Sequence, residues 1–426
     1  MTATPPPQTL AQKLIARAAG RATVQPGETV TCAVDLAMFH DSSGPRRLKP
    51  MLDELKAQIW DKRKVVLVLD HYVPERDDES RRIVRIAREW AAEQALPHVV
   101  DSQGICHIVV PERGLLRPGM FCVGGDSHSP TGGAFGAYMF GIGATEMLGV
   151  VVTGSIWLDV PQTIFMQWDG RLAAGVSAKD MMLAMLGRFG MNGGRYQAVE
   201  YTGDAVRALS MAERMTLANM SAELGAQVGL VAPDATTRDW LAQRGVVIAE
   251  SDALRWRSDD GAEGERHVFD ASMLAPQVAA PHSPANVTTV GELDRTPVQV
   301  AYIGACTGAK LDDLRAAASV LKGRTIAVGV QLLVAPASVA ERCIAERDGT
   351  MGALVDAGAT VLPSACGACA GYGGAIPEGS TVISSTARNF KGRMGAADAR
   401  VYLGSPYTVA ASALRGWISD AREVLG

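Results

Sequence analysis

The sequence lacks an excess of charge of either sign, since its formal net charge is only −4 over 426 residues. Proteins that bind nucleic acids present a basic surface to the phosphates, and proteins that dock on membranes carry clusters of Lys and Arg. The sequence has neither feature, so we expect no nucleic acid and no membrane among its partners.

The sequence also lacks a membrane-spanning segment. Its most apolar stretch, residues 134–157, has a single charge at Glu146 but contains five glycines. A membrane span would need about 20 apolar residues with flanking anchors. The glycines and the β-branched run at 150–152 instead predict a buried helix followed by a buried strand.

The first residues lack the apolar core of a signal peptide. They contain three consecutive prolines at 5–7 and no hydrophobic run. We therefore predict a short disordered lead over residues 1–10.

Cysteine is sparse, and its number, seven, is odd. A secreted disulfide framework would be denser and even-numbered, so we expect a protein of the reducing cytoplasm. Four of the cysteines stand singly among apolar neighbours, where inert burial is the expected state, namely Cys32, Cys106, Cys122 and Cys343.

The other three cysteines form a possible metal cradle. Cys366 and Cys369 make a CxxC pair, and Cys306 lies far upstream in Ile-Gly-Ala-Cys-Thr-Gly. Three thiolates suit an iron–sulfur cluster that keeps one iron free of protein ligands. A zinc site would need a fourth ligand, and a redox pair would sit at a helix N-terminus, but neither alternative is excluded by these residues alone.

Short apolar runs alternate with longer amphipathic ones, which is typical of an α/β fold. Strands are predicted at 64–69, 99–100, 105–110, 120–123, 298–303 and 325–330, and helices at 79–93, 178–189, 211–225, 311–321 and 337–347. The proline-rich segment around 257–296 has little periodicity, so it predicts a crossover between domains.

Two motifs place a carboxylate beside an imidazole directly after a predicted strand, Asp70-His71 and Asp126-Ser127-His128. A carboxylate that pairs with His fixes its tautomer and raises its basicity, which makes a usable proton donor. His107 falls in a predicted apolar strand, where a core role is the more frequent one. His40, beside Asp41, is equally ambiguous.

Arg388 and Arg393 lie in a segment rich in hydroxyl and amide donors, residues 384–393. Arginine binds carboxylates through two parallel hydrogen bonds, so a substrate with two or more carboxylates is the expected partner. The alternative is that these arginines lie in a solvent-exposed basic loop that binds no substrate.

These motifs together resemble the aconitase superfamily, and within it the large subunits of 3-isopropylmalate dehydratase. The resemblance runs from Thr9 to Leu414. Besides the cysteines, it is carried by the segments 35–38, 70–71, 104–107, 125–132, 229–234, 388–395 and 405–411.

The resemblance implies an aconitase-like three-domain α/β/α core without the C-terminal swivel domain. We expect α/β domains over residues 11–135 and 136–257, a crossover linker over 258–296, and a third α/β domain over 297–426 that carries the cluster cysteines.

The resemblance also assigns roles to individual residues. Cys306, Cys366 and Cys369 match the ligands of one [4Fe-4S] cluster with one iron not ligated by protein. The matching acid and base groups are the pairs Asp70–His71 and Asp126–His128, and His107 with Glu200 as its carboxylate. Ser127, Arg388 and Arg393 match substrate contacts, and His40 matches a polar group on the substrate side.

The implied reaction is the dehydration and rehydration of a small hydroxy dicarboxylate, with 2-isopropylmalate to 3-isopropylmalate in leucine biosynthesis as the first expectation. Dimethylmalate, citramalate and the homoaconitase substrate are the alternatives. In relatives the base is a serine on the swivel domain, and this sequence ends at Gly426 without one. A small partner subunit that supplies the serine is therefore implied. A regulator that has lost its cluster and binds RNA is a third reading, which the neutral charge opposes.

The sequence departs from the family pattern at four positions near the cysteines. Gly308 and Ala387 stand where the family usually has Asn, Ala365 stands for Gly, and Ala368 stands for Pro. The three cysteine ligands are all retained, so the sequence defines the type of reaction. The changed neighbours leave the identity of the substrate less well defined.

Overall fold

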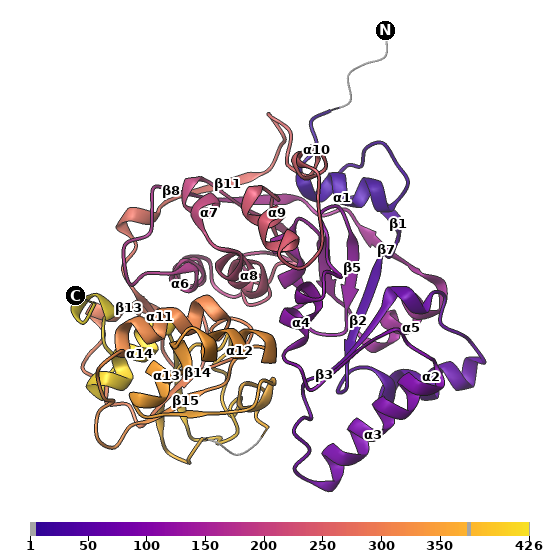
Figure 1. The fold of residues 1–426 in the computed structure, drawn as a ribbon. Helices are drawn as coiled ribbons and strands as arrows, with labels where there is room; N and C mark the ends of the chain where they lie inside the picture. Colours follow the sequence, from indigo (N-terminus) through magenta and orange to yellow (C-terminus); the bar gives the residue numbers. More distant parts are fainter. Residues whose placement is uncertain (1–5, 373–375, 426) are drawn as a thin grey trace.

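A computed structural model of the chain describes residues 6–372 and 376–425. These residues form an α/β fold with three larger sheets built mainly from parallel strands, as predicted. In Figure 1 the first sheet lies with the purple N-terminal part, the second with the magenta middle part, and the third with the orange and yellow C-terminal part.

The first sheet has five parallel strands in the order β4-β3-β2-β5-β6. Their bounds are β2 Leu36–His40, β3 Val65–Leu69, β4 His98–Asp101, β5 Phe121–Gly124 and β6 Tyr138–Gly141. Every residue of β3 is buried, because Leu67 packs in the hydrophobic cluster of α2 and α3 while Val66 packs in that of α4 on the other face. A strand covered on both faces reads as a continuous apolar run.

The second sheet has four parallel strands in the order β10-β9-β8-β11. They are β8 Thr163–Asp169, β9 Ala198–Thr202, β10 Val228–Val231 and β11 Glu265–Asp270. The third sheet has seven strands in the order β13-β12-β18-β17-β14-β15-β16. They are β12 Gln277–Ala279, β13 Val287–Thr289, β14 Val300–Ile303, β15 Gln331–Val334, β16 Ala359–Val361, β17 Thr381–Ser384 and β18 Arg400–Leu403. A two-stranded antiparallel ribbon joins β1 Thr29–Ala33 to β7 Ser155–Asp159.

The helices begin where the sequence offers capping side chains. Thr9, Asp77, Ser177, Ser210 and Asp234 each accept a backbone N–H from the first turn of the helix that follows. The α-helices of the described residues are α1 Leu10–Ala18, α2 Pro45–Leu55, α3 Asp78–Glu93, α4 Cys106–Glu112, α5 Ala144–Thr153, α6 Ala178–Phe189, α7 Asp204–Ala208, α8 Met211–Met220, α9 Ala235–Ala242, α10 Glu250–Arg255, α11 Leu311–Leu321, α12 Val339–Arg347, α13 Thr350–Asp356 and α14 Pro406–Arg415.

Most predicted elements are confirmed within a few residues, but three are wrong. Residues 105–110 form most of helix α4 rather than a strand, because the all-apolar run fits either element and the Asp70 carboxylate accepts the N–H of Cys106 at its first turn. Residues 325–330 form no strand, since Val328 is exposed and Gly329 turns the chain at positive φ before β15 begins. The run at 150–152 lies in helix α5, and the strand follows it.

Two predicted irregular segments are more ordered than their sequences indicate. Within the expected crossover 258–296, β11 joins the second sheet and β12 and β13 join the third. The predicted disordered lead, residues 1–10, is wrong for Gln8, Thr9 and Leu10, which are buried, while residues 1–5 lie outside the described part. Among the described helices, none has the length and apolar character needed to cross a membrane.

Candidate active site

The ends of strands from the first and third sheets meet around one cavity of about 340 Å³. Parallel strands direct their carboxyl ends to the same edge, which is where ligands gather in α/β proteins. Of the residues proposed from the sequence, the cavity is lined by His40, His71, His107, Asp126, Ser127, His128, Cys306, Cys366, Cys369, Arg388 and Arg393. Asp70 lies fully buried behind His71, and only Glu200 lies elsewhere.

Asp70 and His71 follow β3 and form the expected pair, with His71 Nδ1 2.7 Å from Asp70 Oδ1. Burial alone would lower the pKa of His71, but the charge of Asp70 and its hydrogen bond outweigh burial and raise that pKa to about 9. The ring of His71 is therefore protonated on both nitrogens at neutral pH, and its Nδ1 donates to Asp70.

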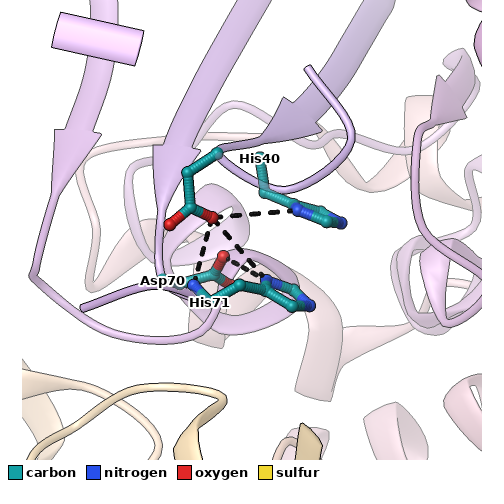
Figure 2. A group of neighbouring side chains, drawn as sticks. His40, Asp70 and His71 are labelled. Carbon is teal, nitrogen blue, oxygen red and sulfur yellow. Dashed lines mark hydrogen bonds and ion pairs between the residues drawn. The ribbon is translucent and has the colours of Figure 1, made fainter. Parts of the chain in front are cut away.

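His40, the last residue of β2, stacks on His71 with ring centroids 3.8 Å apart and planes 12° apart. Figure 2 shows the two rings lying one above the other, with carboxylates on the same side of both. Asp41 lies 3.9 Å from Nδ1 of each ring and accepts the backbone N–H groups of His71 and Tyr72. The sequence showed Asp41 only as a neighbour of His40, so its position against His71 was missed.

Asp126 pairs with His107 rather than with His128. Asp126 Oδ1 lies 2.7 Å from His107 Nε2, whereas the nearest nitrogen of the His128 ring is 3.7 Å away. The backbone N–H of His128 donates to the same oxygen at 2.8 Å, which turns the carboxylate toward the helix α4. The predicted Asp126–His128 pair is thus present as a longer side-chain contact of 3.7 Å, and the closer partner of Asp126 is His107.

The carboxylate partner of His128 is Glu223, which the sequence reasoning missed. Glu223 follows α8, is fully enclosed, and has Oε1 2.9 Å from His128 Nε2 and 2.6 Å from Arg388 Nε. Burial would raise the pKa of Glu223, but the charges of His128 and Arg388 outweigh it and lower the pKa. The predicted helix 211–225 also contains Glu213 and other polar residues, so nothing in the sequence singled out Glu223.

Glu200 is not the partner of His107. It lies buried on β9 in the second sheet, where its Oε2 accepts the hydroxyl of Ser258 at 2.6 Å. Ser258 in turn accepts the N–H of Leu10, so this contact anchors the start of helix α1. The expected pairing of Glu200 with His107 is therefore wrong, because tertiary packing places Glu200 against a different element.

The three cysteines are unbridged and face the same cavity. Asn219 Nδ2 donates to Cys306 Sγ at 3.1 Å. A hydrogen bond from Cys366 lowers the pKa of the Cys369 thiol to about 6, assisted by the charges of Arg393 and His128 and opposed by burial. A thiolate beside cations is the form that binds metal.

The surroundings of the cysteines fit an iron–sulfur cluster better than the alternatives. The CxxC lies in a short 3₁₀ turn, Gly367–Ala370, and not at the N-terminus of an α-helix as a redox pair would. Buried polar atoms without a partner in the described residues include the Tyr302 hydroxyl and Arg393 Nε. Such orphaned donors beside the cysteines and the cavity fit a negatively charged group with acceptor atoms.

The two arginines differ in their partners. Arg388 is tied by Nε to Glu223, while the buried Nε of Arg393 has no acceptor among residues 6–372 and 376–425. The loop that carries them is held from behind by the buried Lys179, whose Nζ donates to the carbonyls of Ser385 and Thr386 at 3.2 and 2.6 Å. Arg393 is thus the arginine best prepared to receive a substrate carboxylate.

Gly308 is required by the packing of Ser385. A Cβ at position 308 would lie well under 3.0 Å from the Ser385 side chain. The Ser385 hydroxyl accepts the N–H of Gly304 at 2.9 Å and donates to nearby carbonyls, so it cannot move without losing these bonds. The missing asparagine at 308 is therefore a consequence of this local packing.

We predict that Gly308→Ala lowers the free energy of unfolding by about 1–3 kcal/mol, because the new methyl group overpacks Ser385. Thermal or urea unfolding of the metal-free chain measures this loss. The double variant Gly308→Ala/Ser385→Gly removes the side-chain part of the clash and keeps the contact with the carbonyl oxygen of residue 385. Relative to Ser385→Gly alone, it should therefore lose less stability than Gly308→Ala loses relative to the wild type. Equal stability of Gly308→Ala and the wild type would contradict this account.

A second prediction concerns Glu200. Burial raises its pKa to about 7, so between the unfolded value of about 4.3 and pH 7 the folded chain binds more protons and its stability falls as pH rises. Glu200→Gln should remove this fall, adding up to about 3 kcal/mol at pH 8 and nothing near pH 4. Unfolding at both pH values measures the difference, and activity should stay at the wild-type level. A large loss of turnover in a folded Glu200→Gln chain would restore Glu200 to the catalytic set.

Comparison with known proteins agrees with the motifs of the sequence. The model of the Aconitase family (aconitate hydratase) matches residues 12–416. The 3-isopropylmalate dehydratase large subunit 1 of Methanopyrus kandleri is 40% identical over 423 residues, covering 98% of this chain and 100% of that protein. The probable methanogen homoaconitase large subunit of Methanosarcina mazei is 42% identical over 393 residues, covering 92% of this chain and 99% of that protein.

A further relative, the 3-isopropylmalate dehydratase large subunit of Nitratidesulfovibrio vulgaris, is 40% identical over 415 residues, covering 96% of this chain and 98% of that protein. Among solved structures, the aconitase X of Thermococcus kodakaraensis aligns with a TM-score of 0.49 at 13% identity, over 86% of this chain and 88% of that one. At that level of similarity it adds nothing to the family assignment, which rests on the sequence matches.

Proposed function

The chain belongs to the aconitase family and is a hydro-lyase large subunit, and we propose that it dehydrates and rehydrates a small hydroxy dicarboxylate of the alkylmalate type. The observation that carries this proposal is the convergence, on one cavity, of three histidine–carboxylate pairs with three cysteines and with Arg393, whose buried Nε has no partner in the described residues. These are the groups needed to protonate a leaving hydroxyl and to hold carboxylates.

Membership of the family implies an iron–sulfur cluster, and we propose a single [4Fe-4S] cluster held by Cys306, Cys366 and Cys369 with one iron left without a protein ligand. When bound, such a cluster supplies a Lewis acid beside the substrate hydroxyl. Asn219, which donates to Cys306 Sγ, then serves as a neighbour that orients the first ligand.

His71 is the proposed acid for the leaving hydroxyl. Asp70 holds Nδ1, so the exchangeable proton sits on Nε2, which lies 4.0 Å from Asp126 Oδ2 on the cavity side. With its pKa raised to about 9, the imidazolium is the dominant form at neutral pH, and Asp70 stabilises it. Rehydration uses the same group in the reverse direction.

The other two pairs and Arg393 are proposed to bind the carboxylates of the substrate. Glu223 partly neutralises both His128 and Arg388, whereas Arg393 Nε has no acceptor in the part of the chain that the structure describes. One carboxylate is therefore expected against Arg393, with Ser127 at the exposed rim as a further donor.

The base that removes the proton from carbon is proposed to come from a separate small subunit. The matched relatives are named large subunits, and this chain covers nearly their whole length. A small subunit of the swivel type that presents a serine to the cavity would complete the site. We therefore propose that the isolated chain lacks turnover.

The first candidate reaction is the conversion of 2-isopropylmalate to 3-isopropylmalate in leucine biosynthesis. The second candidate is the same type of reaction on another alkylmalate, such as dimethylmalate or citramalate, or on the homoaconitase substrate. Relatives of both names match at nearly equal identity, 40% and 42%. The second candidate stays open because amide side chains are absent at Ala387, which lines this cavity, and at Gly308, two positions after Cys306.

We expect the chain, produced anaerobically with the small subunit of its own organism, to be brown and to hydrate or dehydrate one member of a panel of alkylmalates and homocitrate. The chain alone should bind the cluster but show less than a hundredth of that rate. Both rates are measured by following product formation with chromatography. Full activity of the chain alone would refute the proposal that a small subunit supplies the base. Zinc in place of iron would refute the proposed cluster.

The pH dependence of that activity tests His71. If protonated His71 is the acid, the dehydration rate falls as pH rises through about 9, because the folded-state pKa of this group is about 9. The groups that face it are Asp70, Asp41 and Asp126, together with the stacked His40. Asp70→Asn removes the largest favourable charge, so the alkaline limb should move down by about 1–3 pH units.

The matched control for this measurement is Asp101→Asn, which removes a carboxylate from the end of the neighbouring strand β4, where it pairs with Arg88. Its pH profile should superimpose on that of the wild type. An unshifted alkaline limb in Asp70→Asn would exclude His71 as the group that titrates there.

A further inference from the structure

Tyr302 has a buried hydroxyl that nothing in the described chain explains. It lies in β14, two residues before Gly304, with none of its surface exposed. Its hydroxyl is enclosed and has no hydrogen-bond partner within residues 6–372 and 376–425. Buried polar atoms are nearly always paired, so an orphaned hydroxyl calls for a specific acceptor.

The ring is fixed in place by its neighbours. Its outer edge lies over Gly304, where any Cβ would come well under 3.0 Å from the ring and from the hydroxyl. On its own face of the sheet it packs in one apolar cluster with Ala368 and Met394. The hydroxyl therefore cannot swing to solvent or to a different partner.

Tyr302 lies next to both segments that carry the cysteines, the one with Cys306 and the one with Cys366 and Cys369. Gly304 leads directly into Cys306, and Tyr302 shares a small cavity with Gly367 and Ala368, the residues between Cys366 and Cys369. A phenol has an ordinary pKa of about 10, well above neutral pH. The hydroxyl thus stays protonated and can only act as a donor toward a negative sulfur.

The cradle has a shortage of such donors. Asn219 donates to Cys306, whereas the hydrogen bond between Cys366 and Cys369 disappears once both bind metal as thiolates. At the two positions where the family usually has asparagine, Gly308 has no room for a side chain, and Ala387, which lines the cavity, has no donor group.

We propose that Tyr302 donates a hydrogen bond to a sulfur atom of the bound cluster or of its CxxC ligands, and that it is a positioning residue that tunes the cluster. This inference rests on the cluster of the proposed function. A donor to cluster sulfur stabilises the reduced, more negative state and so raises the reduction potential.

The test compares the reconstituted chain with its Tyr302→Phe variant, which removes one oxygen and keeps the ring. A redox titration followed by electron paramagnetic resonance should show a more negative reduction potential in the variant, and the variant cluster should be lost faster in air. The metal-free variant should unfold at the same or a higher temperature than the metal-free wild type, because it no longer buries an orphaned hydroxyl. A purely structural role predicts the opposite for the metal-free chain and no change in potential.

Tyr138→Phe is the matched control, because Tyr138 is also fully buried but lies on β6 in the first sheet with its hydroxyl donating to Gln227. The reduction potential of the cluster in the Tyr138→Phe chain should equal that in the wild type. An unchanged potential in a loaded Tyr302→Phe chain would overturn this inference alone, whereas a wild-type chain that takes up no cluster would overturn the proposed function together with it.

Discussion

The carboxylate of Asp70 is the group on which the rest of the site depends. One oxygen holds Nδ1 of His71, the other accepts the N–H of Cys106 at the start of α4, and the backbone carbonyl accepts the N–H of Cys366. A single residue at the end of β3 therefore positions the proposed acid, the helix that carries His107, and the loop that carries the cluster ligands. Asp70 itself is fully buried, so water has little access to its carboxylate oxygens.

The cavity places several buried carboxylates close together, which would be unfavourable without compensating charge. Three of them have a close cationic or imidazole partner: Asp70 with His71, Asp126 with His107, and Glu223 with His128 and Arg388. The fourth, Asp41, lies 3.9 Å from the nearest imidazole nitrogens, and burial raises its pKa. The pKa of Asp126 is held well below its usual value, since burial, which would raise it, is outweighed by His107. Around the cavity the pKa of His71 is raised and burial lowers that of His107, while Arg393 Nε still has a donor to offer a substrate.

The departures near the cysteines follow from packing. Ser385 occupies the space beside Gly308 and links the cysteine loop to the arginine loop, while Lys179 supports the latter from behind. A side chain at position 308 is thus incompatible with this arrangement of the two loops. The same cradle contains Tyr302, whose hydroxyl is the donor that the two small residues do not provide.

The sequence by itself determined the fold class, the family and most of the site residues, because these follow from local patterns. Asp70-His71 and the CxxC are contacts between near neighbours in the chain, and the apolar run of β3 reads as a buried strand in any context. Periodicity could not separate the helix α4 from a strand, since its apolar run fits both, and this placed His107 on the wrong element. Only the tertiary structure decided the partners: His107 with Asp126, His128 with Glu223, and Glu200 with Ser258. These pairs join residues 19, 95 and 58 positions apart, and such contacts depend on how the helices and sheets pack, which no local sequence pattern encodes.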